Sequence, residues 1–322
     1  MKIGIIGAGA IAKTLAETMR QMDTVTCYAV ASRSAEKAEQ FAREHGFTKA
    51  YGSYEELVSD EQVELVYIAT PHSHHFGHMK LCIEHHKPVL CEKAFTMNAG
   101  QAKEIAQLAE REGVFVAEAI WTRYMPSRNI ISDMLASGII GNVSMLTANL
   151  SYAMAQKERL LRPELAGGAL LDVGVYPLNF ALMSFGDEIE KIESSVSYTH
   201  TGVDAMETIT LFYKDGRMAA LNAGMYGRSD RKGIFYGDKG YIIVENINNP
   251  QSVTAYDLDD RILKRVEVPA QISGYEYELL ECMDRIAKGE TESCSMPLAE
   301  TIQVMELMDG LRRDWGISYP GE

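Results

Sequence analysis

The sequence has little positive charge. Its 31 lysines and arginines stand against 45 aspartates and glutamates, so the formal net charge at pH 7 is −14. Binding to nucleic acid or to an anionic membrane surface requires a basic face. We therefore expect no nucleic-acid partner and no membrane partner, and the charge balance favours a small-molecule substrate.

Disulfide patterns, membrane spans and metal motifs are missing as well. The five cysteines are an odd number, are scattered and form no Cys-x-x-Cys pair, which predicts a reducing cytoplasm and no disulfide framework. No apolar run is expected to reach the length of a membrane span. Six of the eight histidines lie between His72 and His86, yet no carboxylate or cysteine completes a site with ligand spacing, so we predict no metal.

The first 120 residues alternate between apolar strand-like runs and helical patterns. The strand-like runs are 2–8, 25–32, 64–70, 88–93 and 114–120, and the helical patterns lie near 10–22, 34–45, 75–86 and 98–112. Strands that are buried on both faces and alternate with helices are typical of a parallel, doubly wound sheet. We therefore predict an α/β domain over residues 1–120.

The pattern changes over residues 121–322. A helix is expected near 126–137, an alternating strand at 142–153, and two hairpins about Asp215-Gly216 and Lys239-Gly240, with further helices near 274–288 and 297–313. Hairpins that follow a strand–helix half indicate an α+β second domain. Its sheet should be large, open and mainly antiparallel.

The segment GAGAIA at residues 7–12 has the pattern G-x-G-x-x-A and joins the first predicted strand to the first helix. Gly7 would permit a tight turn, Gly9 would let the backbone approach a pyrophosphate at the helix N-terminus, and Ala12 would allow close helix–strand packing. Ala10 and Ile11 would contribute to the same turn. A plain tight turn is the alternative, but five successive strand–helix units favour a dinucleotide-binding Rossmann domain.

An acidic residue is missing where a site for NAD needs one, about 20 residues after the glycines. No acid occurs between Asp23 and Glu36, and Ser32, Arg33 and Lys37 lie there instead. A guanidinium suits a 2′-phosphate and can stack on adenine, which favours NADP(H). The alternative is that these basic residues are the solvated start of a helix.

The strand at 64–70 ends in a polar cluster. Because open parallel sheets bind ligands at the carboxyl ends of their strands, four residues are expected to line the cofactor crevice: Thr70, Pro71, His72 and His75. Three further histidines of this cluster, His78, His85 and His86, are expected on the helix surface.

Two further segments carry polar groups in an apolar context. In VLCEKAFT the buried strand ends in Glu92 and Lys93, and burying either charge is costly unless the strand ends at a cleft. In GGALLDVGVYPLNF a helix is expected to begin at Asp172, and Tyr176 lies four residues later. Positions i and i+4 share one helix face, so this carboxylate and this phenol can face one cleft.

The segments at 7–12, 69–75, 91–93 and 167–176 together resemble, in order and spacing, the glucose–fructose oxidoreductase/inositol dehydrogenase (Gfo/Idh/MocA) family. The resemblance covers nearly the whole chain. AEAIWTRYMP at 117–126 points to the branch that contains dimeric dihydrodiol dehydrogenase and NADP-dependent D-xylose dehydrogenase.

The resemblance implies a role for seven residues. Lys93 matches the active-site lysine of the family, and Glu92 matches the acid that precedes it. Asp172 matches the aspartate on the substrate side, and Tyr176 matches the acid–base residue. Trp121 and Arg123 match a pair near the substrate and the nicotinamide, and Arg33 matches the arginine that binds the 2′-phosphate. One position departs from the pattern, because Ala94 replaces the proline that usually follows the lysine. The orientation of the lysine side chain therefore depends on the conformation of the Lys93–Ala94 peptide.

The expected function is an NADP-dependent oxidoreductase that transfers a hydride between the nicotinamide and the carbinol carbon of a sugar, polyol or diol. The ammonium of Lys93 would lower the pKa of Tyr176 and make it a general base, and Asp172 would hold a substrate hydroxyl. The alternative is a non-catalytic NADP-binding sensor or co-repressor of the same fold, which would not need these three residues.

The resemblance also implies a homodimer, formed through the sheet of the second domain, which would thus serve both substrate binding and oligomerisation. One face of that sheet should cover the helices of its own domain. The other face would then expose either Ile209, Leu211 and Tyr213 or Thr208, Thr210 and Phe212.

Overall fold

The computed structural model describes residues 1–322, which form two compact units. Unit 1 comprises Met1–Trp121 and Gln271–Glu306, and unit 2 comprises Thr122–Ala270 and Leu307–Glu322. The sequence predicts that every residue after 120 belongs to the second domain. The structure differs for residues 271–306, which group with unit 1.

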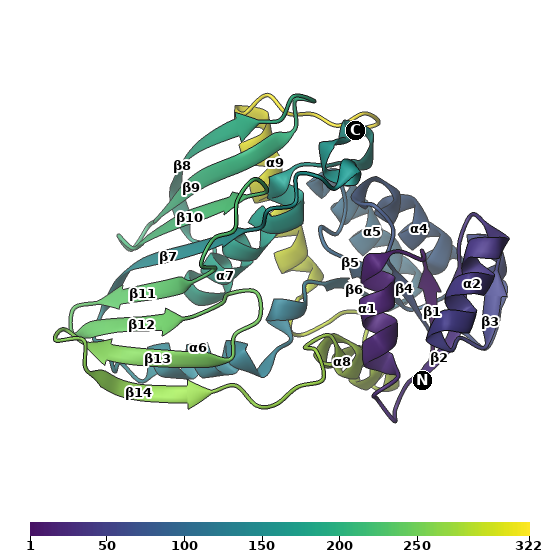
Figure 1. The fold of residues 1–322 in the computed structure, drawn as a ribbon, viewed down its shortest axis with the longest axis horizontal. Helices are drawn as coiled ribbons and strands as arrows, with labels where there is room; N and C mark the ends of the chain where they lie inside the picture. The colour runs from purple at the N-terminus through teal and green to yellow at the C-terminus, as the bar shows by residue number, and fades with distance from the viewer. The chain divides into compact units, whose positions relative to one another are not determined.

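Unit 1 contains a six-stranded parallel sheet with the order β3-β2-β1-β4-β5-β6 (Figure 1). Its strands are β1 (Lys2–Ile6), β2 (Thr26–Ala31), β3 (Lys49–Tyr51), β4 (Leu65–Ile68), β5 (Val89–Glu92) and β6 (Val116–Ala119). Its helices are α1 (Ala10–Met19), α2 (Ala35–His45), α3 (Tyr54–Ser59), α4 (His72–Glu84), α5 (Ala99–Glu112) and α8 (Glu276–Ala287). This strand order is that of the doubly wound dinucleotide fold, so the predicted Rossmann sheet is confirmed.

Two elements of unit 1 were not predicted, and one begins earlier than predicted. Strand β3 has 3 residues and helix α3 has 6, which is too short for a hydrophobic period to show. Helix α3 is instead defined at its start by a capping box between Ser53 and Glu56. Helix α4 begins at His72 because Pro71 is its N-cap, so three residues expected in a loop are helical.

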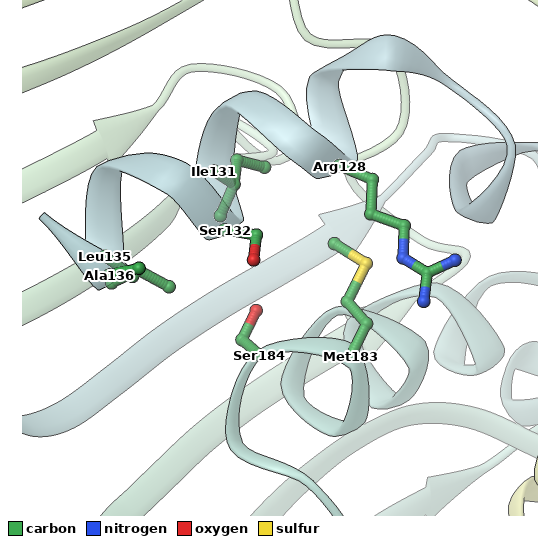
Figure 2. A pocket seen from close by; sticks show the side chains of 7 residues that line it. All are labelled: Arg128, Ile131, Ser132, Leu135, Ala136, Met183 and Ser184. Carbon is green, nitrogen blue, oxygen red and sulfur yellow. The ribbon is translucent and has the colours of Figure 1, made fainter. Parts of the chain in front are cut away.

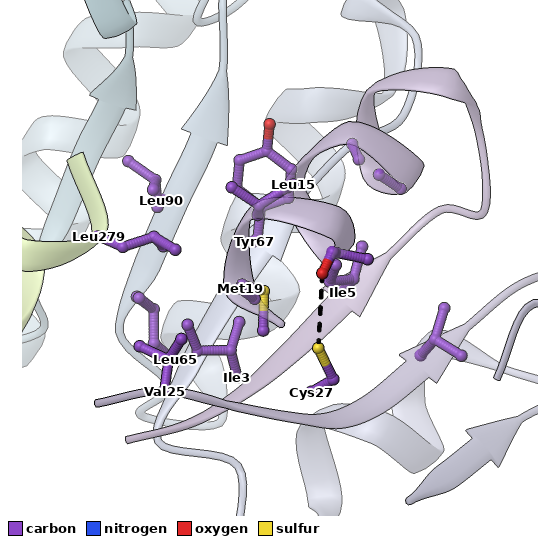
Figure 3. Close-up of a cluster of buried hydrophobic side chains, with 14 of the residues drawn as sticks. Ile3, Ile5, Leu15, Met19, Val25, Cys27, Leu65, Tyr67, Leu90 and Leu279 are labelled. Atoms are coloured by element: carbon purple, nitrogen blue, oxygen red, sulfur yellow. Dashed lines mark hydrogen bonds between the residues drawn. The ribbon is translucent and has the colours of Figure 1, made fainter. Parts of the chain in front are cut away.

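The core of unit 1 explains why α8 belongs to it. Leu279 and Cys282 of α8 are fully buried in the same cluster as Ile3, Leu15 and Tyr67 (Figure 3). Each fully buried aliphatic side chain contributes about 1.5–3 kcal/mol relative to exposure. The apolar face of α8 is therefore satisfied by the parallel sheet, although 156 residues separate the start of α8 from the end of β6, the last strand of that sheet.

Unit 2 contains an eight-stranded sheet with the order β14-β13-β12-β11-β7-β10-β9-β8. Its strands are β7 (Val143–Ser151), β8 (Ile189–Tyr198), β9 (Asp204–Tyr213), β10 (Met218–Gly224), β11 (Gly233–Gly237), β12 (Gly240–Val244), β13 (Ser252–Asp257) and β14 (Ile262–Glu267). Only the central pair β7/β10 is parallel, so the prediction of a mainly antiparallel sheet is confirmed. The hairpins β9–β10 and β11–β12 form where the sequence predicts them.

The remaining elements of unit 2 cover one face of this sheet. They are α6 (Pro126–Ala136), the short turns η2 (Glu158–Leu161) and η3 (Pro163–Leu165), a π-helical turn η4 (Leu170–Gly174) and α7 (Val175–Phe185). Turn η4 packs against β7, β9 and β10, and α7 packs against β7 and β10 (Figure 1). Helix α9 (Leu298–Asp314) is divided between the two units.

One segment is more apolar than the sequence analysis expects. Residues Pro163–Phe185 are long and apolar enough to cross a membrane, with a mean hydropathy of 1.4 in their most apolar window. However, 83% of that window is buried inside the structure. The composition is accounted for by the position of η4 and α7 in the core of unit 2.

Candidate active site

The cofactor end of unit 1 lies where the strand order reverses, between β1 and β4. Gly7 follows β1 with φ of +104°, a conformation that side chains other than glycine rarely adopt. A Cβ at this position would lie 2.9 Å from the carbonyl oxygen of Ala69, just after β4. The two turns that border a dinucleotide crevice are therefore in direct contact, and only glycine fits between them.

At Gly9, in contrast, no packing contact within the protein requires a glycine. A Cβ there would meet nothing within 4 Å, and the backbone φ is −102°. Gly9 is the N-cap of α1, and no side chain caps this helix end. The open space beside Gly9 and the uncapped helix N-terminus fit a pyrophosphate, which would accept hydrogen bonds from the backbone N–H groups of Ala10 and Ile11.

The three residues proposed for the 2′-phosphate follow β2. The hydroxyl of Ser32 is buried and accepts a hydrogen bond from the backbone N–H of Ser34 at 3.4 Å. Arg33 and Lys37 are exposed, and neither side chain forms a hydrogen bond or an ion pair. Their donors are thus available to a ligand, as a phosphate site at the end of β2 requires.

The histidines of the β4–α4 segment divide into two kinds. His72 and His75 are buried and their rings form an edge-to-face pair with centroids 5.8 Å apart. The ring of His75 bridges two carbonyl oxygens, with Nε2 at 2.8 Å from Thr70 and Nδ1 at 2.9 Å from Ala94. Burial lowers the pKa of His75 to about 4 despite these contacts, so the neutral ring donates only one hydrogen bond at pH 7. His75 therefore links the turn after β4 to the turn after β5.

His78 is not the surface residue that the sequence predicts. It is half-buried, its Nδ1 lies 3.0 Å from the hydroxyl of Thr70, and its ring packs edge-on against Tyr54. Burial lowers the pKa of His78 to about 4. His85 and His86 are exposed as predicted, and no group of three or more potential ligands in the structure could hold a metal ion.

Glu92 and Lys93 occupy different surroundings at the end of β5. Glu92 is buried and accepts a short hydrogen bond from the hydroxyl of Tyr67 on the neighbouring strand β4. Burial and then the Glu92 carboxylate raise the pKa of Tyr67 well above its ordinary value, so that Tyr67 remains a donor. Lys93 is half-buried, and the Lys93–Ala94 peptide is cis. The acid is therefore part of the core, whereas the lysine lies at its edge.

Two more acids lie in the same region of unit 1. Glu118 of β6 accepts a hydrogen bond from the backbone N–H of Phe95 at 3.1 Å. Glu278 of α8 is fully buried, and neither of its oxygens has a hydrogen-bond partner in the protein. Burial and then the Glu92 carboxylate raise the pKa of Glu278 well above its ordinary value, which favours its neutral form.

Trp121 and Arg123 belong to one short turn, η1 (Trp121–Arg123). The indole of Trp121 is buried and stacks on Tyr275, with centroids 4.4 Å apart and planes within 7°. Arg123 is also buried and donates from Nε to the side-chain oxygen of Asn179 on α7 at 2.9 Å. These contacts give both residues fixed positions within their units.

Asp172 and Tyr176 are both buried in unit 2, although the helix that carries them differs from the predicted one. Asp172 lies inside the π-helical turn η4, and Tyr176 lies in the first turn of α7. A π-helical turn is rare and frequently marks a functional site. Residues four apart remain on about the same side of such a turn, so the carboxylate and the phenol still face one region.

Asp172 has a partner that the sequence analysis does not identify. The guanidinium of Arg159, from turn η2, donates from Nη2 to Oδ1 of Asp172 at 2.9 Å. The side chain of Asp172 is 7% exposed and that of Arg159 is 42% exposed. A buried carboxylate is thus paired with a cation that reaches it from the solvent side.

Turn η4 is also held by two acids of β9. Oδ2 of Asp204 accepts a hydrogen bond from the backbone N–H of Leu170 at 2.5 Å, and burial raises the pKa of Asp204 to about 6. Glu207 has no hydrogen-bond partner, and a Cβ on Gly174 would lie 2.5 Å from its Oε1. Burial and then the Asp204 carboxylate raise the pKa of Glu207 well above its ordinary value. The turn that carries Asp172 therefore rests on buried carboxyl groups.

A cavity of about 230 Å³ lies between α6 and α7 (Figure 2). Arg128, Ser132 and Ser184 give it polar walls, while the rest of its lining is apolar. Ligand pockets usually measure roughly 300–1,000 Å³, and none of the predicted site residues lines this cavity. Arg128 of its lining donates to the carbonyl oxygen of Arg123, one of the predicted site residues, at 3.3 Å.

Sequence reasoning missed the residues that hold the site together. Tyr67 and Glu278 lie near Glu92, Glu118 accepts a hydrogen bond from the turn after β5, and Arg159 and Asp204 hold the turn of Asp172. Two local signals for these residues are present in the sequence. One is a tyrosine in the otherwise apolar strand 64–70, and the other is an acid in the apolar face of the last helices. No local pattern indicates Arg159, because a tertiary contact alone brings it to Asp172.

Two family models match the chain. Residues 1–119 match the model for the oxidoreductase family with an NAD-binding Rossmann fold, and residues 130–243 match the GFO/IDH/MocA C-terminal domain.

The chain is also similar over its full length to characterised enzymes. It is 32% identical to trans-1,2-dihydrobenzene-1,2-diol dehydrogenase of Xenopus tropicalis, with 99% of each chain covered. It is 34% identical to D-xylose 1-dehydrogenase (NADP(+)) of Hypocrea jecorina, with 99% of this chain and 93% of the relative covered. The crystal structure of a 3-ketoreductase from Actinomadura kijaniata with NADP and TDP-benzene has the same fold, with a TM-score of 0.89 at 22% identity and 97% of each chain covered. The chain therefore belongs to the Gfo/Idh/MocA oxidoreductase family, as the order and spacing of its motifs predict.

Proposed function

We propose that this protein is an NADP(H)-dependent oxidoreductase that interconverts a carbinol and a carbonyl in a sugar, polyol or diol. The observation that carries the proposal is that a chain of this family, similar end to end to a diol dehydrogenase and a xylose dehydrogenase, contains Lys93, Asp172 and Tyr176 together. A protein with a purely regulatory role would not need that set.

Unit 1 is proposed to bind the cofactor. Gly7, Gly9, Ala10 and Ile11 would hold the pyrophosphate, and the turn after β4, with Thr70, Pro71, His72 and His75, would line the crevice with Glu92 and Lys93. The 2′-phosphate would be held by Ser32, Arg33 and Lys37. The exposed, unpaired side chains of Arg33 and Lys37 support a phosphate here, since a ribose hydroxyl calls for an acid instead.

The chain's own residues must position the substrate carbon and move one proton. The bound nicotinamide supplies or accepts the hydride. In the oxidative direction Tyr176 would take the proton from the carbinol hydroxyl, and in the reductive direction it would return it. The ammonium of Lys93 would stabilise the phenolate, Asp172 would accept a hydrogen bond from a substrate hydroxyl, and Trp121 and Arg123 would shape the site beside the nicotinamide.

The proposal is tested by following NADPH formation with D-xylose, D-glucose, myo-inositol and a trans-dihydrodiol, and NADPH oxidation with matching carbonyl compounds. NAD and NADH serve as the matched controls. We expect turnover with at least one member of the panel and a preference for NADP. If NADPH binds but no compound is turned over in either direction, the protein is not the proposed enzyme.

The same proposal includes a cytoplasmic homodimer without nucleic-acid or membrane partners. The five cysteines are free and four of them are buried, which suits a reducing compartment. In β9, Ile209, Leu211 and Tyr213 are buried, so the opposite face carries Thr208, Thr210 and Phe212. Met206 on that opposite face is 45% exposed, which leaves apolar area for a second copy to cover.

Light scattering at micromolar concentration tests the dimer. We expect twice the chain mass for the unmodified protein and the mass of one chain after Thr208→Arg with Met206→Lys, because charges buried at an interface without partners are costly. Lys264→Glu on edge strand β14 is the control and should not change the mass. A single-chain mass for the unmodified protein contradicts the dimer.

A further inference from the structure

The ion pair between Arg159 and Asp172 leaves most of the guanidinium unused. A guanidinium carries five N–H donors in a planar fork. In the structure only Nη2 has a partner, and the Nε and Nη1 groups of Arg159 form no hydrogen bond. The side chain is 42% exposed, so these donors are open to a ligand that approaches Asp172.

Asp172 and Arg159 thereby place an acceptor and a set of donors side by side. A carboxylate accepts from an O–H group, and a guanidinium donates to an oxygen lone pair. Two hydroxyls on adjacent carbons match this arrangement, because one can donate to Asp172 while its neighbour accepts from Arg159. A lone hydroxyl would satisfy only one of the two groups.

An anionic substrate fits less well than a neutral one. A carboxylate or phosphate would gain a bidentate contact with Arg159 only by lying against the Asp172 carboxylate. Like charges that close repel, and the guanidinium is already neutralised by its partner. The chemistry of the pair therefore favours a neutral substrate with two vicinal hydroxyls.

We propose that Arg159 is a specificity-determining residue that, together with Asp172, selects neutral substrates carrying two vicinal hydroxyls. This inference rests on the proposed function and adds to it the substrate class and one residue that recognises it. Asp172 holds one hydroxyl and Arg159 donates to the oxygen of the next.

The test compares D-xylose and D-glucose with their 2-deoxy and 3-deoxy analogues, using the unmodified protein, Arg159→Met and Arg159→Lys. Arg162→Met is the matched control, since Arg162 lies in the same segment, is 46% exposed and pairs with Glu158 and Glu164 instead of Asp172. Binding of NADPH is measured for each variant by fluorescence.

For the unmodified protein we expect one deoxy analogue of the preferred sugar to lose about 10- to 100-fold in kcat/KM, the range for a hydrogen bond to a charged group. With the parent sugar, Arg159→Met should lower kcat/KM by the same factor, mainly through a higher KM. With that deoxy analogue, Arg159→Met should leave kcat/KM almost unchanged. Arg159→Lys should restore part of the discrimination, and Arg162→Met should behave as the unmodified protein. NADPH binding should be equal in all four proteins.

Two outcomes contradict the inference and are distinguishable. If the sugars are turned over but Arg159→Met loses equally on the parent sugar and on both analogues, Arg159 only supports Asp172 and selects nothing. If the unmodified protein turns over no compound of the full panel of sugars, myo-inositol and trans-dihydrodiol, the proposed function fails and the inference fails with it.

Discussion

In unit 1 the candidate site residues follow the ends of parallel strands, whereas in unit 2 they lie on a helical turn that side chains from distant strands hold in place. Gly7 and Lys93 come directly after strands of the same sheet and Thr70 comes two residues after another, so the backbone alone brings them to one edge. Asp172 instead lies in η4, which is fastened to β9 through Asp204 and approached by Arg159 from η2.

The comparison shows two ways to fix a functional side chain. In unit 1 the pairing of the strands positions the site residues, independently of the side chains around them. Glycine is required where two backbone turns approach each other closely. In unit 2 buried carboxyl groups hold the site turn in place. Each of these groups must have hydrogen-bond partners or remain neutral. We expect substitutions in unit 1 to affect binding without unfolding the chain, and substitutions under η4 to affect folding.

The largest effect is expected from the proposed acid–base pair, which takes one residue from each unit. Tyr176→Phe removes a hydroxyl and Lys93→Met an ammonium, and each should lower kcat by roughly 10²–10⁴, the scale of general acid–base catalysis. Stopped-flow hydride transfer measures this, with NADPH binding followed by fluorescence as the control for folding. Turnover of Tyr176→Phe at the unmodified rate would show that the base lies elsewhere, with His72 and His75 as the next candidates.

Glycine-to-alanine substitutions test most directly the difference between the two units in their effects on stability and on cofactor binding. Gly168 has φ of +109°, and a Cβ there would lie 2.2 Å from Oδ1 of Asp204, so Gly168→Ala should destabilise the protein by about 2–4 kcal/mol. Gly9→Ala meets no atom within 4 Å and should lower the free energy of unfolding by only about 1 kcal/mol, the cost of a poorer N-cap, while strongly weakening NADPH binding. Denaturant unfolding and fluorescence titration measure the two quantities.

Gly113→Ala, at the end of α5, is the control for the left-handed backbone conformation alone. Its φ is +64° and its ψ is +33°, but no atom lies within 4 Å of the added Cβ. It should therefore cost only the left-handed conformation, about 1–2 kcal/mol. A loss as large as that of Gly168→Ala would mean that contact with Asp204 does not matter.

Two aspartates, Asp204 of unit 2 and Asp60 of unit 1, should give the units opposite pH dependence. The pKa of Asp204 is raised by burial to about 6, above its unfolded value near 3.9, so its contribution to stability is present below pH 4 and is lost as the pH rises to about 6. The Asp204→Asn variant cannot titrate. Its stability relative to the unmodified protein should therefore increase by about 2–3 kcal/mol between pH 4 and pH 7.

Asp60 of unit 1 should show the reverse. Burial alone would raise its pKa, but hydrogen bonds from Lys49, Tyr51 and Tyr28 outweigh that effect and hold the pKa well below its usual range. Its contribution is present above about pH 4 and is lost on acidification. Asp60→Asn should thus lose stability relative to the unmodified protein as the pH rises from 2 to 4. Denaturant unfolding across pH checks both variants, and equal slopes would contradict the contrast.

The last effect is a change of cofactor preference in unit 1. Arg33→Ala should weaken NADP binding by about 1.5–3 kcal/mol, the value of one charge-assisted contact with a phosphate, and leave NAD binding nearly unchanged. Glu36→Ala, three residues later on the same exposed helix start, is the control. Equal affinities of the unmodified protein for NADP and NAD would refute the assignment of Arg33.

The sequence by itself determined the parallel sheet, the family and the positions of Gly7, Gly9, Lys93, Asp172 and Tyr176. These features depend on local signals, namely hydrophobic period, turn glycines and motif spacing, which act over a few residues. The hairpins of unit 2 were predictable for the same reason.

Only the tertiary structure decided which groups surround those residues. Arg159 meets Asp172, Tyr67 meets Glu92, and Leu279 returns to the core of unit 1 because packing brings together segments that are far apart in the chain. The π-helical form of η4 likewise depends on the Asp204 anchor on β9 and on the glycines that admit it. Burial then sets the charge of Asp204, Glu207 and Glu278, since the cost of a buried charge depends on neighbours that no local pattern contains.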